Sequence, residues 1–350
     1  MPFADRFVPA LVGLVALATS LLPAPARAAV AAPSAPALSP GFSASFWSPY
    51  WFFNRADQAG DLAAFLAAQR SSGSDQVILD WTVDADPHAS DAAYLASPTL
   101  GLGAFNDTVD ALLPAAKAAG MKVWVGLVVA PDSWAKPANF TSESFLSKQL
   151  VLTNAVADDL YSRYHNEIDG WYVPVEPSWD MIATPKRALR LGEWYRGITD
   201  HLHALSGLPV MVSPSMPYAA LAGHSALDFV DAMRPMVAAA GVDVWNIQDG
   251  FEMTAWTPTQ EVAALVRARS LVQRYGGTLW ADLYTPPSDS NGQVPVAKLL
   301  PYLSAIAAAG IPESQWLFAD YFAPPGLSGT DPHAVQNLLA YMDYLGSGTT

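Results

Sequence analysis

The chain contains no cysteine and little positive charge. Without cysteine among its 350 residues, it can form no disulfide, no thiolate metal site and no cysteine nucleophile. Lysine and arginine number 18 against 32 acidic residues, which gives a formal charge of −14, and the basic residues form no cluster. Nucleic acid and anionic membranes are therefore not expected as partners. A neutral ligand such as a sugar suits this composition better.

Long apolar runs are also lacking, apart from one near the N-terminus. Leu11–Leu22 is largely apolar, follows Arg6 and precedes the small-residue site Ala26-Arg27-Ala28, so residues 1–28 are expected to be a cleaved signal peptide. An uncleaved membrane anchor is the alternative. No later stretch holds 18 apolar residues in a row, so no membrane insertion is expected after cleavage. The protein is expected to be secreted or periplasmic.

The segment after this peptide separates it from a folded domain. Residues 29–40 are rich in proline, alanine and serine and are expected to be a disordered leader. Residues 41–350 are expected to form one domain. Apolar residues make up 51% of the chain, which is enough for a large core.

A weak repeat organises residues 41–350. An alanine-rich helical run ends in glycine and an apolar strand follows at once, as in Ala118-Ala119-Gly120-Met121. A glycine at this place lets the chain leave a helix. The junction glycines are Gly73, Gly120, Gly170, Gly207, Gly241, Gly277 and Gly310. The expected strands are Phe42–Trp47, Gln76–Trp81, Lys122–Val129, Gly170–Val175, Pro209–Ser213, Val242–Gln248, Thr278–Leu283 and Gln315–Asp320.

Helix-length segments separate these eight strands. The expected helices are Asp61–Arg70, Thr108–Ala119, Ser142–His165, Pro185–Leu205, Ala226–Ala239, Thr259–Tyr275, Val296–Ala309 and Asp331–Leu345. This alternation predicts an α/β fold, a single (β/α)8 barrel, also called a TIM barrel. An open doubly wound sheet is the alternative, but the first strand is not followed by Gly-x-Gly-x-x-Gly.

Glu176 is the first candidate catalytic residue. A glycine turn leads into an aromatic and β-branched run, which predicts a buried strand over 170–175. Pro177 cannot donate to a sheet and disfavours helix at the residue before it, so Glu176 is held where that strand ends. A solvated loop glutamate has the same local sequence, so the prediction depends on what surrounds it.

A parallel barrel has its active site at the C-terminal ends of its strands, and the loops after the expected strands are rich in aromatic and acidic residues. The aromatic residues, which can stack on sugar rings or cap the core, are Trp47, Tyr50, Trp51, Trp134, Trp179, Tyr218, Phe251, Trp256, Tyr284, Tyr321 and Phe322. The acids, which can catalyse, bind sugar hydroxyls or cap helices, are Asp80, Asp84, Asp86, Glu176, Asp180, Asp249, Glu252, Asp282 and Asp320. Glycoside hydrolysis needs two carboxyl groups that flank one bond, and this set can supply them.

Several sequence blocks together carry a family resemblance. They are residues 42–51, 77–81, 120–127, 170–176, 212–214 and 243–250. In this order they resemble a glycoside-hydrolase-like barrel family known as domain of unknown function 4434, from Gly41 to about Phe322. The resemblance implies a (β/α)8 barrel and, through the similarity of that family to retaining barrel glycosidases, a carbohydrate substrate.

The resemblance also implies roles for individual residues. Glu176 takes the place of the acid/base glutamate that ends strand four, although the usual Asn-Glu-Pro is here Val175-Glu176-Pro177. On strand seven, Tyr284 stands where a Trp-Ala-x-x-Glu pattern has glutamate. Asp282 or, second, Asp249 is then the expected partner carboxylate. A shorter or displaced carboxylate leaves a wider gap, which favours an inverting route through water.

Metal ions and cofactors are not expected. His201 and His203 are two residues apart in a helical run, so they cannot face one metal ion together. The acidic stretch Asp84–His88 offers oxygen ligands for calcium, but a solvated loop is the preferred interpretation. Ser213-Pro214-Ser215 lacks the glycines of a nucleophile elbow.

The expected function is hydrolysis of an oligo- or polysaccharide with Glu176 as general acid. The expected sugar-binding residues are Trp47, Trp51, Asp80, Trp134, Trp179, Tyr218, Gln248, Tyr284 and Asp320. The alternative is a non-catalytic glycan-binding barrel that handles a surface or exported polymer. It becomes the better interpretation if no second carboxylate meets Glu176. The sequence leaves the oligomeric state open.

Overall fold

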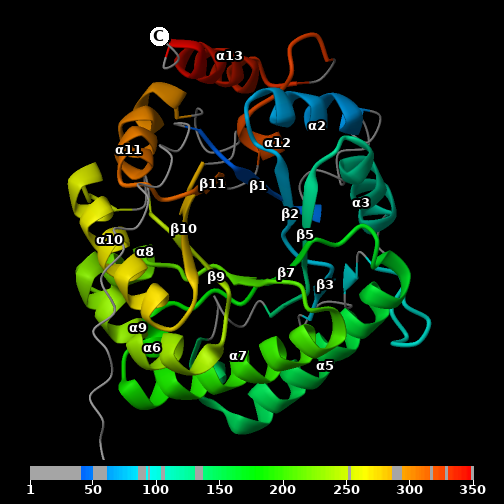
Figure 1. Ribbon diagram of the computed structural model, residues 1–350, viewed down its shortest axis with the longest axis vertical. Helices are drawn as coiled ribbons and strands as arrows, with labels where there is room; N and C mark the ends of the chain where they lie inside the picture. Colours follow the sequence, from blue (N-terminus) through cyan, green and yellow to red (C-terminus); the bar gives the residue numbers. More distant parts are fainter. Residues whose placement is uncertain are drawn as a thin grey trace, which may run out of the picture. The chain divides into compact units, whose positions relative to one another are not determined.

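Eight parallel strands close into a barrel in the computed structural model, which describes residues 41–49, 61–85, 92–93, 95–103, 107–130, 137–250, 254–285, 294–315, 318–327 and 330–347 (Figure 1). The barrel strands are β1 (Ala44–Trp47), β2 (Gln76–Leu79), β5 (Lys122–Gly126), β7 (Gly170–Val173), β8 (Val210–Val212), β9 (Val244–Gln248), β10 (Thr278–Leu283) and β11 (Glu313–Gln315). β1 pairs in parallel with both β2 and β11, which closes the ring. The predicted (β/α)8 barrel is confirmed.

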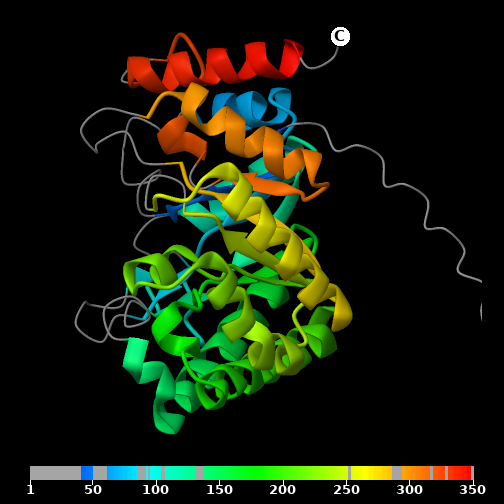
Figure 2. The same cartoon turned by 90° about the vertical axis from the view of Figure 1, so that its left-hand side faces the viewer.

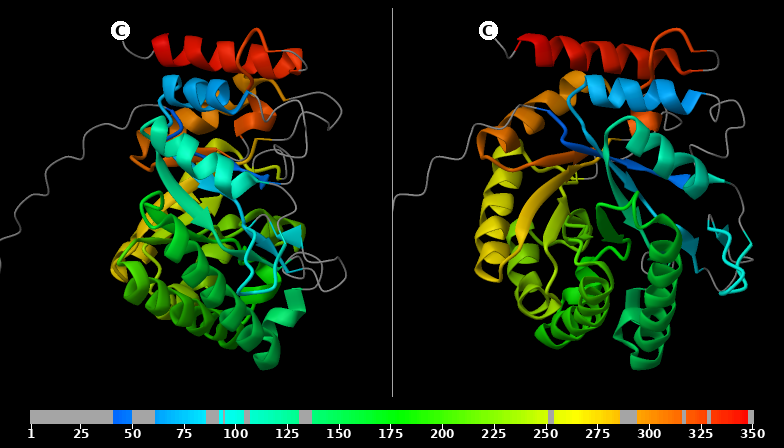
Figure 3. Two further views of the ribbon diagram at one scale, coloured as in Figure 1. Left: turned by 90° about the vertical axis from the view of Figure 1, so that its right-hand side faces the viewer. Right: turned by 45° about the vertical axis from the view of Figure 1, so that its right-hand side comes forward.

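Long helices surround the strands (Figures 1 and 3). In the described residues they are α2 (Leu62–Ser71), α3 (Thr108–Ala118), α5 (Glu143–Tyr164), α7 (Pro185–Ser206), α9 (Ala226–Ala240), α10 (Pro258–Arg274), α11 (Val296–Ala308) and α13 (Pro332–Ser347). Their ends lie within about two residues of the predicted ones. Capping explains several starts, because the side chains of Thr184, Ser225 and Thr257 each accept a backbone N–H of the following turn. None of these helices is long and apolar enough to span a bilayer.

Short elements occupy the connections at the C-terminal ends of the strands. They are η2 (Pro137–Thr141), α6 (Trp179–Ile182), α8 (Pro217–Leu221), α12 (Phe318–Tyr321) and a small sheet of β3 (Val83–Asp84), β4 (Ala92–Ala93) and β6 (Val128–Val129). α6 follows β7 and α8 follows β8, so both carry side chains to the barrel mouth. The last helix, α13, red in Figure 2, packs against α11.

The predicted eighth strand, Gln315–Asp320, is wrong in its extent. β11 ends at Gln315, and Phe318–Tyr321 forms the helical turn α12. The aromatic run has strand propensity, but Phe318 and Phe322 are four residues apart and pack on one side of that turn, with ring centroids 5.4 Å apart. Burial of these rings outweighs the local preference for a strand.

Three smaller predictions also differ from the structure. The expected strand Lys122–Val129 is divided into β5 and β6. Gly276 rather than Gly277 has the positive φ, 88°, at the end of α10. Gly170 does not end a helix but begins β7, where a Cβ atom would lie 2.3 Å from the Trp124 ring. The role of Gly170 is therefore to make room for an indole inside the barrel.

Side chains alternate between a core inside the barrel and a core between strands and helices. Phe46, Ile78, Trp124, Tyr172, Met211, Val244 and Trp280 fill the inside of the barrel. Their neighbours on the same strands, such as Trp47, Leu79 and Trp245, pack in the core beneath the helices. This alternation follows from the two-residue period of a strand. It also decides which acids can reach the barrel mouth.

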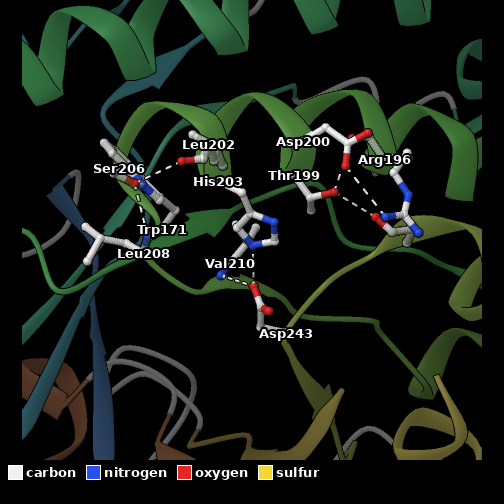
Figure 4. A network of polar contacts seen from close by, with 11 residues as sticks. Trp171, Arg196, Thr199, Asp200, Leu202, His203, Ser206, Leu208, Val210 and Asp243 are labelled. Atoms are coloured by element: carbon white, nitrogen blue, oxygen red, sulfur yellow. Dashed lines mark hydrogen bonds and ion pairs between the residues drawn. The ribbon is translucent and has the colours of Figure 1, made fainter. Parts of the chain in front are cut away.

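A network of polar contacts joins α7 to the N-terminal ends of the strands (Figure 4). His203 Nε2 lies 2.8 Å from Asp243 Oδ2, and the same oxygen accepts the backbone N–H of Val210 at 2.8 Å. His201, two residues earlier, contacts Asp158 instead. Each histidine therefore has its own acidic partner, at the end of the barrel opposite Glu176.

Candidate active site

Three acids face inward at the C-terminal mouth of the barrel, and we call Asp80, Glu176 and Asp282 the inner acids. Asp80 directly follows β2, Glu176 follows β7 by three residues, and Asp282 is the penultimate residue of β10. The residues two or four positions earlier on the same strands pack inside the barrel, so the alternation turns all three acids the same way. The inner acids are 2%, 7% and 1% exposed, respectively.

Two hydrogen bonds to neighbouring backbone groups hold Glu176 in place. The Tyr195 hydroxyl on α7 donates to the carbonyl of Val175 at 2.6 Å. The backbone N–H of Ser215 donates to the carbonyl of Pro177 at 2.9 Å. The residues on both sides of Glu176 are therefore tied to α7 and to the segment after β8. A glutamate held in this way is pre-organised, which a catalytic group requires.

Asp80 lies where the chain after β2 passes close to β5. A Cβ atom on Gly126 of β5 would lie 2.0 Å from the backbone oxygen of Asp80, so this position accepts only glycine. Oδ2 of Asp80 is buried and has no hydrogen-bond partner among the described residues. Burial raises the pKa of Asp80 well above its usual range, and the nearby charges of Glu176 and then Asp282 raise it further. Asp80 is therefore a buried carboxyl group with one oxygen left for a ligand.

Asp282 is anchored by a neighbouring strand. The Ser314 hydroxyl of β11 donates to Asp282 Oδ1 at 2.9 Å, and Ser314 also contacts Asn246 of β9. Burial raises the pKa of Asp282, the Ser314 hydrogen bond lowers it, and the charges of Asp249 and Glu176 raise it. The net direction is upward. Asp282 is thus close enough to Glu176 for the two groups to interact electrostatically.

Tyr172 lies beneath the inner acids. Its ring is fully buried inside the barrel and packs edge-on against Phe46, with centroids 5.2 Å apart. The Tyr172 hydroxyl has no hydrogen-bond partner among the described residues. Burial raises the pKa of Tyr172, and Glu176, Asp80 and Asp282 raise it further, in that order. One phenol is therefore within electrostatic reach of all three inner acids.

Partly exposed aromatic residues lie beside Glu176. Burial raises the pKa of Tyr218 on α8, and Glu176 and Tyr284 add to the shift, so these three residues are close together. Trp179 on α6 stacks on His224, with ring centroids 3.8 Å apart. Tyr218, Tyr284 and Trp179 are each partly exposed. The structure thus brings together Tyr218 and Tyr284, two of the aromatic residues that the sequence placed near a sugar, whereas Trp179 packs on His224.

Gln248 also points into the barrel. It is the last residue of β9 and pairs with Asp282 in the strand register. Its Oε1 accepts a hydrogen bond from the Ser215 hydroxyl at 2.6 Å. This bond orients the Gln248 side-chain amide at the mouth. Gln248, predicted to bind sugar, therefore lies beside one of the inner acids.

Asp249 faces away from the barrel mouth, although it remains within electrostatic reach of Asp282. Asp249 follows Gln248 directly, so it turns to the opposite face of the sheet, where its Oδ1 accepts the backbone N–H of Tyr284 at 3.1 Å. Its charge raises the pKa of Glu261 on α10 and of Glu313 on β11, in each case after burial as the main cause. We call Asp249, Glu261 and Glu313 the outer acids. The alternation places Asp249 on the outer face of the sheet, and its catalytic role stays a prediction.

Trp47 does not lie at the barrel mouth. The sequence placed it beside the sugar, but its side chain is 1% exposed and lies in the core beneath the helices. Its indole N–H donates to Oε1 of Gln69 on α2 at 2.7 Å. The residue before it, Phe46, is the one that points into the barrel. Trp47 therefore joins the barrel to a helix.

Some predicted site residues lie outside the described residues. They are Trp51 and Trp134, together with Tyr50, Asp86, Phe251 and Glu252. Asp320 belongs to α12, but its side chain is not described. Asp180 is exposed on α6, whereas Tyr321 and Phe322 are buried in the core.

The sequence interpretation missed four residues of this site. Tyr172, Tyr195, Asn246 and Ser314 contact or flank the inner acids but were not selected. A signal existed for Asn246, because a polar amide among the apolar residues Val244, Trp245 and Ile247 needs a buried partner. Within the described residues, no group of three or more histidine, aspartate or glutamate side chains could hold a metal ion.

Solved structures with this architecture include proteins that act on sugars. A "putative alpha-L-fucosidase" from Bacteroides thetaiotaomicron VPI-5482 aligns with a TM-score of 0.70 at 17% identity over 94% of this chain and 99% of that one. An endo-1,4-beta-D-mannanase from Thermotoga petrophila RKU-1 aligns with a TM-score of 0.59 at 12% identity, over 88% and 99% of the two chains. The PgaB (BpsB) glycoside hydrolase domain from Bordetella bronchiseptica gives 0.57 at 13%, over 87% and 98%. These identities show a shared fold.

Sequence comparison identifies the family. No curated protein sequence matches this chain. A family model described as domain of unknown function (DUF4434) matches residues 57–311, which include β2, β5, β7, β8, β9 and β10 and all three inner acids. The resemblance found in the sequence is confirmed. The chain belongs to the DUF4434 family of (β/α)8 barrels.

Proposed function

We propose that this barrel hydrolyses glycosidic bonds in an oligo- or polysaccharide. The observation that carries the proposal is the meeting of three inward-facing carboxyl groups at the barrel mouth, next to partly exposed aromatic side chains. The reaction needs two carboxyl groups that flank one bond, and aromatic rings stack on sugar faces. The likeness to a mannanase and to a glycoside hydrolase domain adds support, because those proteins have the same fold.

Glu176 is the general acid in this proposal. It is the most exposed of the inner acids, and the hydrogen bonds to Val175 and Pro177 hold it at the mouth. Its proton passes to the glycosidic oxygen as the bond from that oxygen to the anomeric carbon breaks. The leaving sugar then departs as a neutral alcohol.

Asp282 is the proposed partner of Glu176. An ionised Asp282 either attacks the anomeric carbon, which forms a glycosyl-enzyme that water later hydrolyses, or takes a proton from the water that attacks that carbon. The first route retains the anomeric configuration and the second inverts it. Proton NMR of the first product anomer distinguishes the two routes.

The remaining residues of the mouth are proposed to bind the sugar. Asp80 Oδ2 and the Tyr172 hydroxyl are buried polar atoms without a partner among the described residues, so a sugar hydroxyl would satisfy both. Tyr218, Tyr284 and Trp179 offer partly exposed rings. The side-chain amide of Gln248 adds a polar contact on the same side as Asp282.

A glycan-binding barrel without hydrolytic activity is the second candidate, and one observation favours it. Tyr284 occupies the position where related glycosidases have a glutamate on strand seven, and Asp282 is 1% exposed. If Asp282 cannot reach the anomeric carbon, the second carboxyl group that hydrolysis requires is not in place. The barrel would then hold a polymer during its export or remodelling.

One experiment separates the two candidates. The purified protein is first tested for binding on a glycan array, and each bound glycan is then incubated with the protein and analysed for shorter products. The hydrolase proposal predicts new reducing ends, whose release stops in Asp282→Asn while binding persists. Binding with no product from any bound glycan contradicts the hydrolase and supports the binding protein.

Export is part of the proposal. It rests on the apolar run Leu11–Leu22 and the small-residue site Ala26-Arg27-Ala28. Cleavage after Ala28 would release a protein that begins at Ala29 in the periplasm or the medium. N-terminal sequencing of the mature protein tests this, and a mature protein that keeps residues 1–28 contradicts it.

A further inference from the structure

Two polar side chains on the strands next to β10 hold Asp282 in place. Ser314 on β11 lies beside Asp282 in the strand register, and Asn246 lies on β9, on the other side of β10. Asn246 and Ser314 are fully buried, and Asp282 is nearly so. Most inward positions below the mouth carry apolar side chains. Two buried polar residues in this place therefore need a specific reason.

The hydrogen bonds among these residues direct the proton of the Ser314 hydroxyl toward Asp282. Asn246 Nδ2 donates to Ser314 Oγ at 2.8 Å, and Ser314 Oγ lies 2.9 Å from Asp282 Oδ1. Ser314 Oγ is also 3.1 Å from Asn246 Oδ1, but a hydroxyl has one proton to donate. A carboxylate is the stronger acceptor, so the proton is directed to Asp282.

We propose that Ser314, oriented by Asn246, is a positioning residue that favours the ionised form of Asp282 and leaves Asp282 Oδ2 as the reacting oxygen. The proposal rests on the function proposed above, because it supplies the ionised partner that Glu176 requires. A nucleophile or general base must be deprotonated before the reaction begins. A donor that is fixed on Oδ1 also fixes the rotation of the carboxylate, so Oδ2 presents the same lone pairs in every turnover.

The environment of Asp282 shows why such a donor is needed. Burial and the charges of Asp249 and Glu176 all raise the pKa of Asp282, and the Ser314 hydrogen bond acts in the opposite direction. Removal of the hydroxyl therefore leaves the raising effects unopposed. A hydrogen bond to a charged group is strong enough that its loss should move the titration of Asp282 upward by about 1–2 pH units.

The test compares Ser314→Ala with the wild type by two independent measurements. Carbon-13 NMR of labelled aspartate carboxyl groups follows the titration of Asp282, which is identified by the signal missing in Asp282→Asn. The pH dependence of kcat/KM follows the same group during catalysis, where its ionisation gives the acidic limb. Both the NMR titration and the acidic limb should move upward by about 1–2 pH units, because both report the same carboxyl group.

Ser213→Ala is the matched control. Ser213 is also a fully buried inward serine, but its hydroxyl donates to the backbone carbonyl of Asn246 at 2.8 Å. Loss of the Ser213 hydroxyl should leave the pH at which Asp282 titrates unchanged. Ser314→Cys provides a second variant if Ser314→Ala does not fold, because the thiol has a similar size and is a much weaker donor.

The outcomes separate this proposal from the proposed function. A titration of Asp282 that is unchanged in the folded Ser314 variants overturns the positioning role. An equal shift in Ser213→Ala also overturns it, because any buried serine would then have the same effect. If no glycan is cleaved but the NMR titration shifts as expected, the hydrolase proposal fails, and only the effect of Ser314 on the ionisation of Asp282 stands.

Discussion

The inner and outer acids are equally buried but face different surroundings. Asp80, Glu176 and Asp282 point into the barrel mouth, where the partly exposed rings of Tyr218 and Tyr284 lie close to Glu176. Asp249, Glu261 and Glu313 point into the layer between strands and helices, and neither carboxyl oxygen of Glu261 has a partner among the described residues. Burial is the largest cause of the raised pKa for Asp80, Asp282, Glu261 and Glu313.

The difference shows that orientation, rather than residue type or burial, separates an acid that can meet a ligand from an acid that is enclosed in the core. Gln248 faces the mouth and Asp249, the next residue, faces the helices. In the same way, Ser314 faces the inside of the barrel and Glu313, the residue before it, faces the helices. An inward acid can meet a ligand that changes its charge. Glu261 and Glu313 are enclosed in this layer with raised pKa values, so they should affect stability rather than rate.

The largest expected effect on rate distinguishes Asp282 from Asp249, the two carboxyl groups that the sequence offered as partners of Glu176. Asp282→Asn should lower kcat by about 10²–10⁴-fold, because the amide can neither attack carbon nor accept a proton from water. Asp249→Asn keeps an acceptor for the Tyr284 N–H and should retain a rate near that of the wild type. Initial rates on the cleaved glycan measure both. Equal losses in the two variants would show that the division into inner and outer acids has no catalytic meaning.

Two tryptophans extend the comparison to aromatic residues. Trp47→Ala removes a buried indole that bonds Gln69, so the free energy of unfolding should fall by about 3–5 kcal/mol. Trp179→Ala removes a partly exposed ring at the mouth, so it should weaken glycan binding with a smaller loss of stability. For both variants, denaturant unfolding measures the stability and a titration with glycan measures the binding. If Trp47→Ala instead weakens binding and leaves stability intact, its placement in the outer core is wrong.

Glu261 should make stability depend on pH. Below the ordinary carboxyl pKa, the folded and unfolded chains both keep the proton of Glu261. Above it the unfolded chain releases the proton while the folded chain keeps it, so the free energy of unfolding falls with rising pH, by up to about 1.4 kcal/mol per pH unit. This loss continues until the pH passes the raised pKa of the folded state.

Glu261→Gln tests this dependence because glutamine does not ionise. The variant should match the wild type near pH 4 and exceed its stability at pH 7 to about 9, with a gap that grows with pH. Its rate of glycan cleavage should not change. Thermal unfolding across this pH range is the measurement. A gap that stays constant with pH would mean that Glu261 is already ionised in the folded protein.

Tyr172 should show the smallest effect on stability and a separate effect on function. Its buried hydroxyl has no partner among the described residues, so Tyr172→Phe should leave the free energy of unfolding unchanged or raise it by about 1 kcal/mol. If the hydroxyl binds a sugar, KM should rise or kcat should fall about tenfold. Unfolding and kinetics are measured on one preparation. A destabilised variant with normal kinetics would assign the hydroxyl to the fold.

The fold was predictable because its signals are local. The alternation of alanine-rich helices, glycine junctions and apolar strands predicted eight strands in order, and the helix ends agree within about two residues. The place of Glu176 just after a strand was predictable for the same reason, since Pro177 and the apolar run before it define a strand end. These features depend on a few neighbouring residues.

The site was less predictable because it depends on which way each side chain faces. Phe46 and Trp47 are both large and apolar, and nothing local shows which one enters the barrel. Asp249 and Asp282 both lie at strand ends, and their opposite orientations follow from where β9 and β10 stop. Ser314 was missed because the predicted eighth strand began one residue after it. Such errors are small along the chain, but a shift of one residue reverses the face of a strand.

The central claim is that Glu176 is the general acid at the mouth of this barrel, and Glu176→Gln tests it most directly. Glutamine preserves the shape and neutral hydrogen bonding of the residue but cannot deliver a proton. On the natural polymer, whose leaving group is poor, the rate should fall by about 10²–10⁴-fold, while an activated aryl glycoside should lose much less because its departure needs little protonation. Glycan binding should persist in both cases. Cleavage of the natural polymer by Glu176→Gln at the wild-type rate would contradict the account.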